Sequence, residues 1–452
     1  MNRHAAISIV KTLVKQGHKA YFAGGCVRDE LMGLQPDDID IATSAKPEEI
    51  IKLFPKTFEK GKAFGVISVM IDGEEFEVAT FRKEGKYSDG RRPDHVEWTS
   101  DRQDAMRRDF TINGLFYDPI ENKIIDYVEG KQDIQGKIIR TIGNPYHRFD
   151  EDKLRMMRAV RFSSRFQYPL EEETKKALIE MTPQITEVSP ERIQGELLKI
   201  LTQPHADQGI NLLSEIGILK IILPEIDAMK GVEQPPQFHP EGDVYVHTLL
   251  LLKNLDHPNP ELAMGALLHD VGKPATFTVK ERIRFDGHTE VGAEIARKIL
   301  RRLRFSNKQI EHISSLILQH LQFINVKQMR KSTLKRFLLQ AGFQDHLELH
   351  RLDCLGCHAI LENYYFCKEK LEELKKEPPP RKPIVSGKEL IQLGFKPGPI
   401  FKKILEAIET AVLEGEIKTK KEGLKLAKEE FGSYIEKKFQ KKDKKKRPGK
   451  KK

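Results

Sequence analysis

Residues 21–45 read YFAGGCVRDELMGLQPDDIDIATSA, and this stretch decides the expected fold. Gly24 and Gly25 follow an apolar pair typical of a strand and precede a helical run, so their backbone N–H groups can approach a phosphate closely. Arg28 comes about one helical turn later, where its guanidinium can reach the same anion. The first half of the stretch therefore predicts a strand, a phosphate-binding turn and a helix.

The second half of the stretch carries a pair of carboxylates. Asp38 and Asp40 flank Ile39, and strand geometry directs such alternate side chains to the same face. With Ile39 and Ile41 turned into a core, the two carboxylates can hold Mg²⁺ through oxygen ligands. The metal would activate an attacking hydroxyl and neutralise charge on a triphosphate. A plain glycine turn followed by an acidic loop is the alternative.

The formal net charge of +10 is concentrated at one end of the chain. Residues 437–452 hold eleven Lys or Arg and one Asp, so the other 436 residues sum to zero. This basic tail has one aromatic residue and little to bury, which predicts disorder. Weak, salt-sensitive attraction to RNA and a purely solubilising role are equally compatible with it.

Length and composition limit the class of protein. A chain of 452 residues is expected to form two to four domains. It has no run of 18 apolar residues and no apolar secretory segment at its start, and its four cysteines follow no disulfide spacing. We therefore expect a cytoplasmic protein that does not enter a membrane. A homodimer is left open.

Hydrophobic periodicity predicts a small mixed sheet backed by helices in the first part of the chain. Apolar residues recur at helical spacing over 4–16, and Pro47 opens a second helix over 47–53. Strand-like runs lie at 20–23, 38–42, 65–71 and 75–81. A polar segment then fills 82–104.

In this order the residues resemble the signature of class II nucleotidyltransferases of the polymerase-beta superfamily, the group of bacterial tRNA CCA-adding enzymes and poly(A) polymerases. The matches run from about residue 21 to 200. The resemblance implies that Glu77 is a third carboxylate on the adjacent strand, although an exposed strand residue fits the pattern equally well. It also implies that 82–104 is the flexible loop of CCA-adding and A-adding enzymes, with an ordinary surface loop as the alternative.

A second motif supports the same resemblance. Residues 107–113 read RRDFTIN, which resembles the family's second motif, with Gly114 where alanine is commoner. The resemblance implies that Arg108 contacts the triphosphate or the sugar. It implies that Asp109 and Asn113 position the sugar or order the strand.

A third region, residues 151–162 (EDKLRMMRAVRF), has helical periodicity without a helix breaker. Asp152, Arg155, Arg158 and Arg161 recur every three residues and are expected on one side of a single helix. Asp152 can accept from the exocyclic amino group of adenine or cytosine while Arg155 donates to the ring nitrogen. Uracil and guanine reverse this pattern, and each unpaired polar group costs about 1–3 kcal/mol. A surface salt bridge between Asp152 and Arg155 is the plainer alternative.

The resemblance assigns the same base-reading role to Asp152 and Arg155. It maps Arg158 and Arg161 to positions that contact the nucleotide. Farther on, residues 189–193 (SPERI) open another helix, with a serine at the N-cap and a proline at the first helical position. They resemble a family motif that braces the neck, and 150–230 is expected to be helical.

The middle of the chain carries a second set of metal-binding residue types. His269 and Asp270 end an apolar helix over 262–268 and precede VGKP, which is the signature of HD-type metal phosphohydrolases. The complete ligand series of that family, in chain order, is His247, His269, Asp270, His288, His320 and Asp353. The minimum set omits His288 and His320, which would complete a second metal site or bind phosphate. Imidazole with carboxylate suits a divalent transition metal, which can generate hydroxide from water. The resemblance implies phosphatase or cyclic-phosphodiesterase activity.

Together these patterns predict an α/β head of the polymerase-beta type followed by helical domains. The expected boundaries are a head at 1–140, a helical neck and body at 141–230, an HD domain at 231–374, a linker at 375–384, a helical C-terminal segment at 385–431 and a basic tail at 432–452.

The expected reaction is template-independent addition of CMP and AMP, from CTP and ATP, to the 3′ end of tRNA, with Mg²⁺. An A-adding enzyme that works with a separate CC-adding enzyme, and a poly(A) polymerase, are alternatives within the class. An HD phosphohydrolase with an RNA-binding head is the alternative from another class.

Overall fold

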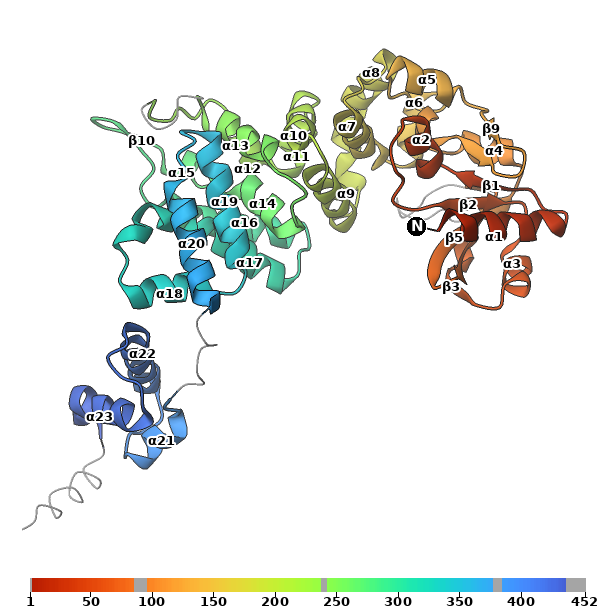
Figure 1. The fold of residues 1–452 in the computed structure, drawn as a ribbon. Coiled ribbons are helices and arrows are strands. Elements are labelled where there is room, and N and C mark those ends of the chain that lie inside the picture. Colours follow the sequence, from red (N-terminus) through yellow and green to blue (C-terminus); the bar gives the residue numbers. More distant parts are fainter. Residues whose placement is uncertain (1, 85–95, 237–241, 377–383, 436–452) are drawn as a thin grey trace, which may run out of the picture. The chain divides into compact units, whose positions relative to one another are not determined.

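The computed structural model describes residues 2–84, 96–236, 242–376 and 384–435. The chain forms two compact units, one of Met1–Leu318 with Leu355–Ala359 and one of Gln319–Cys354 with Ile360–Lys452. Each unit is described by itself (Figure 1). Among the described residues, no helix combines the length and the apolar character needed to cross a bilayer.

A mixed sheet forms the head of the first unit. Its strands, in spatial order, are β3 (Thr57–Gly61), β4 (Val66–Ile71), β5 (Glu74–Thr80), β2 (Asp40–Thr43), β1 (Ala20–Ala23), β8 (Phe116–Asp118) and β9 (Lys123–Ile125). Only β2 and β5 pair in parallel among these strands; the other neighbours are antiparallel. The predicted mixed sheet is therefore confirmed, and the four expected strands correspond to β1, β2, β4 and β5.

Helices α1 (Arg3–Lys15) and α3 (Pro47–Leu53) pack on this sheet, as the periodicity predicted (Figure 1). The alternation in the second half of the organising stretch is also observed. Ile39 and Ile41 are buried, whereas Asp38 is exposed and Asp40 is half-buried. The apolar side chains enter the core, and the carboxylates remain on the accessible side.

Short elements complete the head. They are α2 (Gly25–Leu31), η1 (Lys62–Phe64), α4 (Asp101–Met106), η2 (Thr111–Asn113) and α5 (Gly130–Gly136). The ends of the expected flexible loop pair as a two-stranded ladder, β6 (Arg82–Glu84) with β7 (Val96–Trp98). Residues 85–95 of that loop lie outside the described residues.

A helical segment follows, as expected for 150–230. It contains α6 (Pro145–Glu151), α7 (Arg155–Phe166), α8 (Glu172–Met181), η3 (Thr182–Glu187), α9 (Pro190–Thr202), α10 (Ala206–Glu215), α11 (Ile218–Ile222) and α12 (Pro224–Asp227). The prediction of one continuous helix over 151–162 was wrong, because α6 ends at Glu151 and α7 begins at Arg155. The Asp152 side chain accepts a hydrogen bond from the backbone N–H of Leu154 at 3.0 Å, and this local bond replaces helical pairing.

The rest of the first unit is mainly helical. It contains α13 (Val244–Lys253), α14 (Pro260–Leu268), α15 (Lys273–Thr276), the hairpin β10 (Thr278–Val279) and β11 (Ile283–Arg284), α16 (His288–Arg302) and most of α17 (Asn307–Gln319). Gly272 allows α15 and α16 to approach. A Cβ at this position would lie 2.1 Å from the carbonyl oxygen of His288, so a larger residue would separate the two segments.

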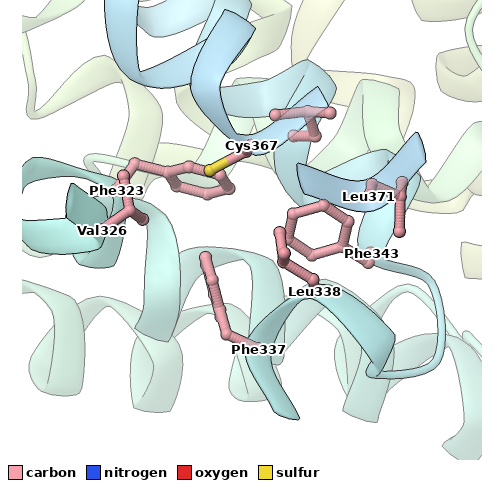
Figure 2. Packing of buried hydrophobic residues seen from close by; sticks show 8 residues of the cluster. Phe323, Val326, Phe337, Leu338, Phe343, Cys367 and Leu371 are labelled. Carbon is pink, nitrogen blue, oxygen red and sulfur yellow. The ribbon is translucent and has the colours of Figure 1, made fainter. Parts of the chain in front are cut away.

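Two apolar cores lie among the described residues of the second unit. The first joins η4 (His320–Gln328), α18 (Lys331–Leu339), α19 (Phe343–Gly356) and α20 (Glu362–Lys376). The Phe337 ring is edge-on to two others in this core, with its centroid 5.0 Å from that of Phe323 and 5.3 Å from that of Phe343 (Figure 2). The second core joins α21 (Gly387–Gln392), α22 (Pro399–Glu414), α23 (Lys420–Phe431) and η5 (Gly432–Tyr434). The C-terminal segment is therefore helical, as predicted. Most of the expected linker (377–383) and nearly all of the basic tail (436–452) lie outside the described residues.

Candidate functional site

Three carboxylates meet at the edge where β2 begins. Asp40 is the first residue of β2, and the parallel register pairs Ile41 with Val78 of β5. The preceding residues, Asp40 and Glu77, are therefore neighbours on adjacent strands. Burial raises the pKa of Asp40 to about 6, and the negative charges of Asp38 and Glu77 add to this effect. A carboxylate with a raised pKa beside two others is the electrostatic arrangement of a site for a divalent cation.

The charge of Arg108 acts on this group. Its charge opposes the rise in the Asp40 pKa. Its Nη1 would lie 2.8 Å from a Cβ built on Gly24, which has a φ of 72°. Gly24 is thus required both by its backbone conformation and by the guanidinium packed against it. Arg108 is held by Asp104, whose Oδ2 accepts from Nη2 at 3.1 Å. The sequence-predicted residues Gly24, Arg108 and Asp40 are brought together.

The glycine turn differs in detail from the expectation. The backbone N–H of Gly24 donates to the carbonyl oxygen of Leu115 at 3.0 Å, so this group joins β1 to the loop before β8. Gly25 is half-buried and opens α2. Any phosphate contact by the turn must use groups other than the Gly24 N–H.

Arg28 is only 4% exposed. Its Nε donates to Asp29 at 2.8 Å and its Nη1 donates to Asn113 Oδ1 at 2.6 Å. The guanidinium also faces the rings of Phe162 and Phe166, at 5.2 and 4.9 Å from their centroids. Arg28 therefore connects α2 to η2 and to α7, and its predicted contact with triphosphate stays a prediction.

The same network continues through Asp109. Its Oδ1 accepts from the side-chain amide of Asn113 at 3.0 Å, and its Oδ2 accepts from Arg158 Nε at 2.8 Å. Burial alone would raise the pKa of Asp109, but the charge of Arg158 and the Asn113 hydrogen bond outweigh it and hold the pKa well below its usual range. Asp109 is therefore an ionised, buried link between the head and α7.

Asp152 and Arg155 do not pair with one another, contrary to the salt-bridge alternative. Arg155 is buried, and its Nη1 donates to the carbonyl oxygen of Arg148 at 3.0 Å and contacts Glu151 at 2.5 Å. Asp152 Oδ2 instead accepts from Arg192 Nη2 at 2.7 Å. Arg192 belongs to the SPERI segment, whose bracing role thus acts directly on the predicted base-reading carboxylate.

Arg161 lies at the far end of the predicted stripe. It is buried and its Nε donates to the buried carboxylate of Glu196 in α9. Its guanidinium also lies over the Phe162 ring, 4.3 Å from the centroid. The four stripe residues therefore have different environments, and only Arg158 and Asp152 are half-buried rather than buried.

A second cluster lies within the first unit. His247 comes from α13, His269 and Asp270 follow α14, and His288 opens α16; all four are buried. Asp270 Oδ2 lies 3.1 Å from His269 Nε2 and 3.8 Å from His247 Nε2, and its Oδ1 lies 3.7 Å from His288 Nε2. Ligands of one metal ion are separated by about 3–4 Å when the bonds are about 2.0–2.2 Å long. The donor set therefore fits a divalent metal.

The electrostatics agree with this fit. Burial alone would raise the pKa of Asp270, but His269 and Lys273 hold it well below the usual range. Burial lowers the pKa of His288, which favours the neutral imidazole that a metal requires. Sequence reasoning missed Lys273, although this residue lies only three positions after Asp270. Its Nζ lies 2.7 Å from Asp270 Oδ2 and 2.6 Å from Gln234 Oε1.

The two remaining predicted ligands belong to the second unit. His320 is the first residue of η4 and is buried, and Asp353 lies in α19. Their roles as ligands stay predictions.

Comparisons with known proteins assign the family. A family model described as a poly A polymerase head domain matches residues 20–140, and a probable RNA and SrmB-binding site of polymerase A matches 167–230. A putative tRNA nucleotidyltransferase domain 2 matches 287–427. The CCA-adding enzyme of a Geobacillus species is 33% identical over 92% of this chain and 94% of the relative. That of Staphylococcus saprophyticus is 35% identical, over 92% and 96%.

The chain belongs to the CCA-adding enzymes. It is therefore a tRNA nucleotidyltransferase, and the resemblance to class II nucleotidyltransferases inferred from the sequence is confirmed. Among solved structures, the Bacillus stearothermophilus CCA-adding enzyme in complex with CTP has a TM-score of 0.74 at 30% identity, with 95% of this chain and 98% of that one covered. A Thermotoga maritima CCA-adding enzyme complexed with tRNA has a TM-score of 0.56 at 20% identity, which supports the fold alone.

Proposed function

We propose that the head adds CMP and AMP, from CTP and ATP, to the 3′ end of tRNA, and that Asp38, Asp40 and Glu77 carry the reaction. The observation that supports these residues most directly is the parallel register of β2 and β5, which sets Asp40 beside Glu77 while Ile39 and Ile41 enter the core. The head shares its family model and its relatives with CCA-adding enzymes, and one such relative has been solved with CTP.

The three carboxylates would hold Mg²⁺, which activates the terminal hydroxyl of the tRNA and neutralises charge on the triphosphate. Arg108 lies where it can contact the triphosphate, because it packs on Gly24 and its charge reaches Asp40. Asp40 is half-buried, whereas Asp38 and Glu77 are exposed, so the group is accessible to a metal ion and a nucleotide. Preorganised charge of this kind is the main source of catalysis in phosphoryl transfer.

Asp152 and Arg155 would select the base. Both oxygens of Asp152 accept hydrogen bonds, from Leu154 N–H and from Arg192, so the orientation of the carboxylate is fixed before the nucleotide arrives. A carboxylate that is fixed in this way can accept from the amino group of adenine or cytosine but not pair with the carbonyl of uracil. This supports a protein-based template for two bases.

The proposal is tested with three tRNA transcripts, one that ends before CCA, one that ends after the first C and one that ends after CC. Each is incubated with CTP, ATP and Mg²⁺. We expect all three to be completed to CCA. Extension of only the transcript ending in CC would make the protein an A-adding enzyme, and continued addition of A would make it a poly(A) polymerase. Asp40→Asn should abolish extension, and Asp37→Asn, at an exposed neighbour, should not. Full activity of Asp40→Asn would refute the assignment of the site.

The cluster of His247, His269, Asp270 and His288 supports a second function. We propose that it holds a divalent transition metal for hydrolysis of phosphate esters, which is the role of HD-type centres. The bound metal would supply hydroxide at neutral pH. Lys273 would add positive charge beside the metal, because its Nζ is held between Asp270 and Gln234.

This second function is tested by metal binding and by hydrolysis. The purified protein is stripped of metal and titrated with Co²⁺, Ni²⁺ or Mn²⁺, and phosphate release from a 3′-phosphorylated oligonucleotide is followed. His269→Ala should lose both the metal and the hydrolysis. His257→Ala is the matched control, because that side chain is 88% exposed. Equal metal content in wild type and His269→Ala would refute the assignment.

A further inference from the structure

The β10–β11 hairpin has an apolar face. Thr278 pairs with Arg284 and Val279 with Ile283, so alternate residues Phe277, Val279, Ile283 and Phe285 share one side. This face is only partly covered: Phe277 is 40% exposed and Val279 is 63% exposed. A hairpin with two-residue strands is too short to be stable by itself, so an apolar face kept at the surface calls for a functional explanation.

The aromatic residues of this face lead to the histidine cluster. The Phe277 and Phe285 ring centroids are 5.9 Å apart, and Phe285 lies 6.5 Å from the His288 ring in an edge-on arrangement. The carbonyl oxygen of Phe285 is 2.8 Å from His288 Nδ1. The Lys273 ammonium lies over the Phe285 ring, 5.4 Å from its centroid, and contacts Asp270. An exposed aromatic surface is thus continuous with the buried polar centre.

Basic residues alternate with the apolar residues along this hairpin. Lys280, Arg282 and Arg284 are exposed on the turn and on β11. Two carboxylates, Glu281 and Asp286, are also exposed, which leaves the hairpin with a net charge of +1. Aromatic side chains beside cations are the usual elements for binding single-stranded nucleic acid, because each base has a face that can stack and each link carries a negative charge.

We propose that the β10–β11 hairpin binds the end of a single-stranded RNA and stacks its terminal base on Phe277 and Phe285. The terminal phosphate then lies toward His288 and Lys273. This inference rests on the second proposed function and names the substrate of that centre as an RNA end. RNA is favoured over a protein segment because one occupant must supply both a flat apolar group and an anion directed at the cluster.

Binding in the absence of metal tests the proposal. The full chain in EDTA is titrated with a tetranucleotide that carries 2-aminopurine at its last position and a 3′-terminal phosphate. Stacking quenches the fluorescence of this base. We expect Phe277→Ala to weaken binding about tenfold and to reduce the quenching, since stacking on an aromatic side chain contributes about 1–3 kcal/mol per base. Tyr365→Ala is the matched control, because that ring is 59% exposed and lies in the second unit.

Charge is tested by the double variant Lys280→Ala/Arg282→Ala. Its binding should be less sensitive to salt, with the slope of log K against log salt reduced in magnitude by up to about 1.4. Equal affinity of wild type and Phe277→Ala, or an equal loss in Tyr365→Ala, would overturn the proposal. A mononucleotide 3′-phosphate that binds as tightly as the tetranucleotide would overturn the assignment to an RNA end.

RNA binding by the hairpin and hydrolysis at the histidine cluster can be refuted independently. If His269→Ala keeps its metal but Phe277→Ala still loses RNA, the hairpin binds RNA and the hydrolytic function is wrong. CCA addition by Phe277→Ala on the three tRNA transcripts should equal that of wild type, because the hairpin contributes no residue to the proposed head site. A loss of CCA addition in Phe277→Ala would overturn the assignment of the hairpin to the second centre.

Discussion

Arg192 donates a hydrogen bond to Asp152 over 2.7 Å, across 40 residues of sequence. The other oxygen of the same carboxylate accepts from the backbone N–H of Leu154. Asp152 is thereby held between the first turn of α9 and the break that separates α6 from α7. A carboxylate fixed from two sides can discriminate between bases, because it cannot rotate to accommodate a wrong one.

The first prediction concerns Arg192 as a positioning residue. Arg192→Ala leaves Asp152 with one of its two partners, and we expect the ratio of kcat/KM for ATP over UTP to fall about tenfold, the equivalent of one charged hydrogen bond. Thermal unfolding should change much less. Arg192→Lys should restore part of the discrimination, which a purely structural role would not require. The exposed neighbour gives the control Glu191→Gln. Unchanged selectivity in Arg192→Ala would contradict the prediction.

The second prediction concerns the buried carboxylate of Asp109. Its pKa is depressed in the folded state, so its ionisation stabilises the fold above the usual carboxyl pKa of about 4, and this stabilisation is lost as the pH falls toward the lower, folded-state value. Asp109→Asn should therefore lower the free energy of unfolding by about 3 kcal/mol at pH 7, because Arg158 loses its buried partner. The difference should shrink below pH 4. Urea denaturation at pH 7 and pH 3.5 measures both values, and a deficit that is independent of pH would contradict the linkage.

These two sites show what the sequence can predict. The β2 strand and its accessible carboxylates follow from alternation of Ile39 and Ile41 with Asp38 and Asp40, which is a local pattern. The break in the helix at Asp152 escaped prediction. The spacing of three residues between Asp152 and Arg155 is compatible with a continuous helix, and it does not show that the Asp152 side chain bonds to the Leu154 backbone instead.

Contacts between distant segments escape for a different reason. Nothing in the local sequence indicates that Arg28 is buried under Phe162 and Phe166. The chemistry of a guanidinium after a glycine turn suggests phosphate binding, and only tertiary packing reveals the competing partner Asn113. Residue types thus indicated which side chains are candidates for the site. Tertiary packing determines which of these side chains already bond to other protein groups.

The third prediction uses the pKa of Asp40. Its value of about 6 in the fold exceeds the usual value near 4, so ionisation of Asp40 destabilises the metal-free protein, fully above pH 6 and not at all below pH 4. Asp40→Asn should thus be more stable than wild type by about 2–3 kcal/mol at pH 7.5 in EDTA, and equally stable at pH 4. Mg²⁺ should reduce the difference by stabilising only wild type. Asp37→Asn should change stability by less than about 0.5 kcal/mol. A metal-free Asp40→Asn that is no more stable than wild type would contradict the assigned electrostatics.

The fourth prediction separates two roles of Arg161. Its guanidinium is buried against Glu196. Removing one member of a buried ion pair strongly destabilises the fold, whereas replacing both members with apolar residues of similar size does not. Glu196→Gln should therefore lower the free energy of unfolding by about 3 kcal/mol, and the double variant Arg161→Met/Glu196→Leu should recover most of it. If the contribution of Arg161 is structural, as this burial indicates, the double variant keeps its KM for CTP and ATP within twofold. A tenfold rise in both KM values in a variant of restored stability would instead establish the nucleotide contact that the family resemblance implies.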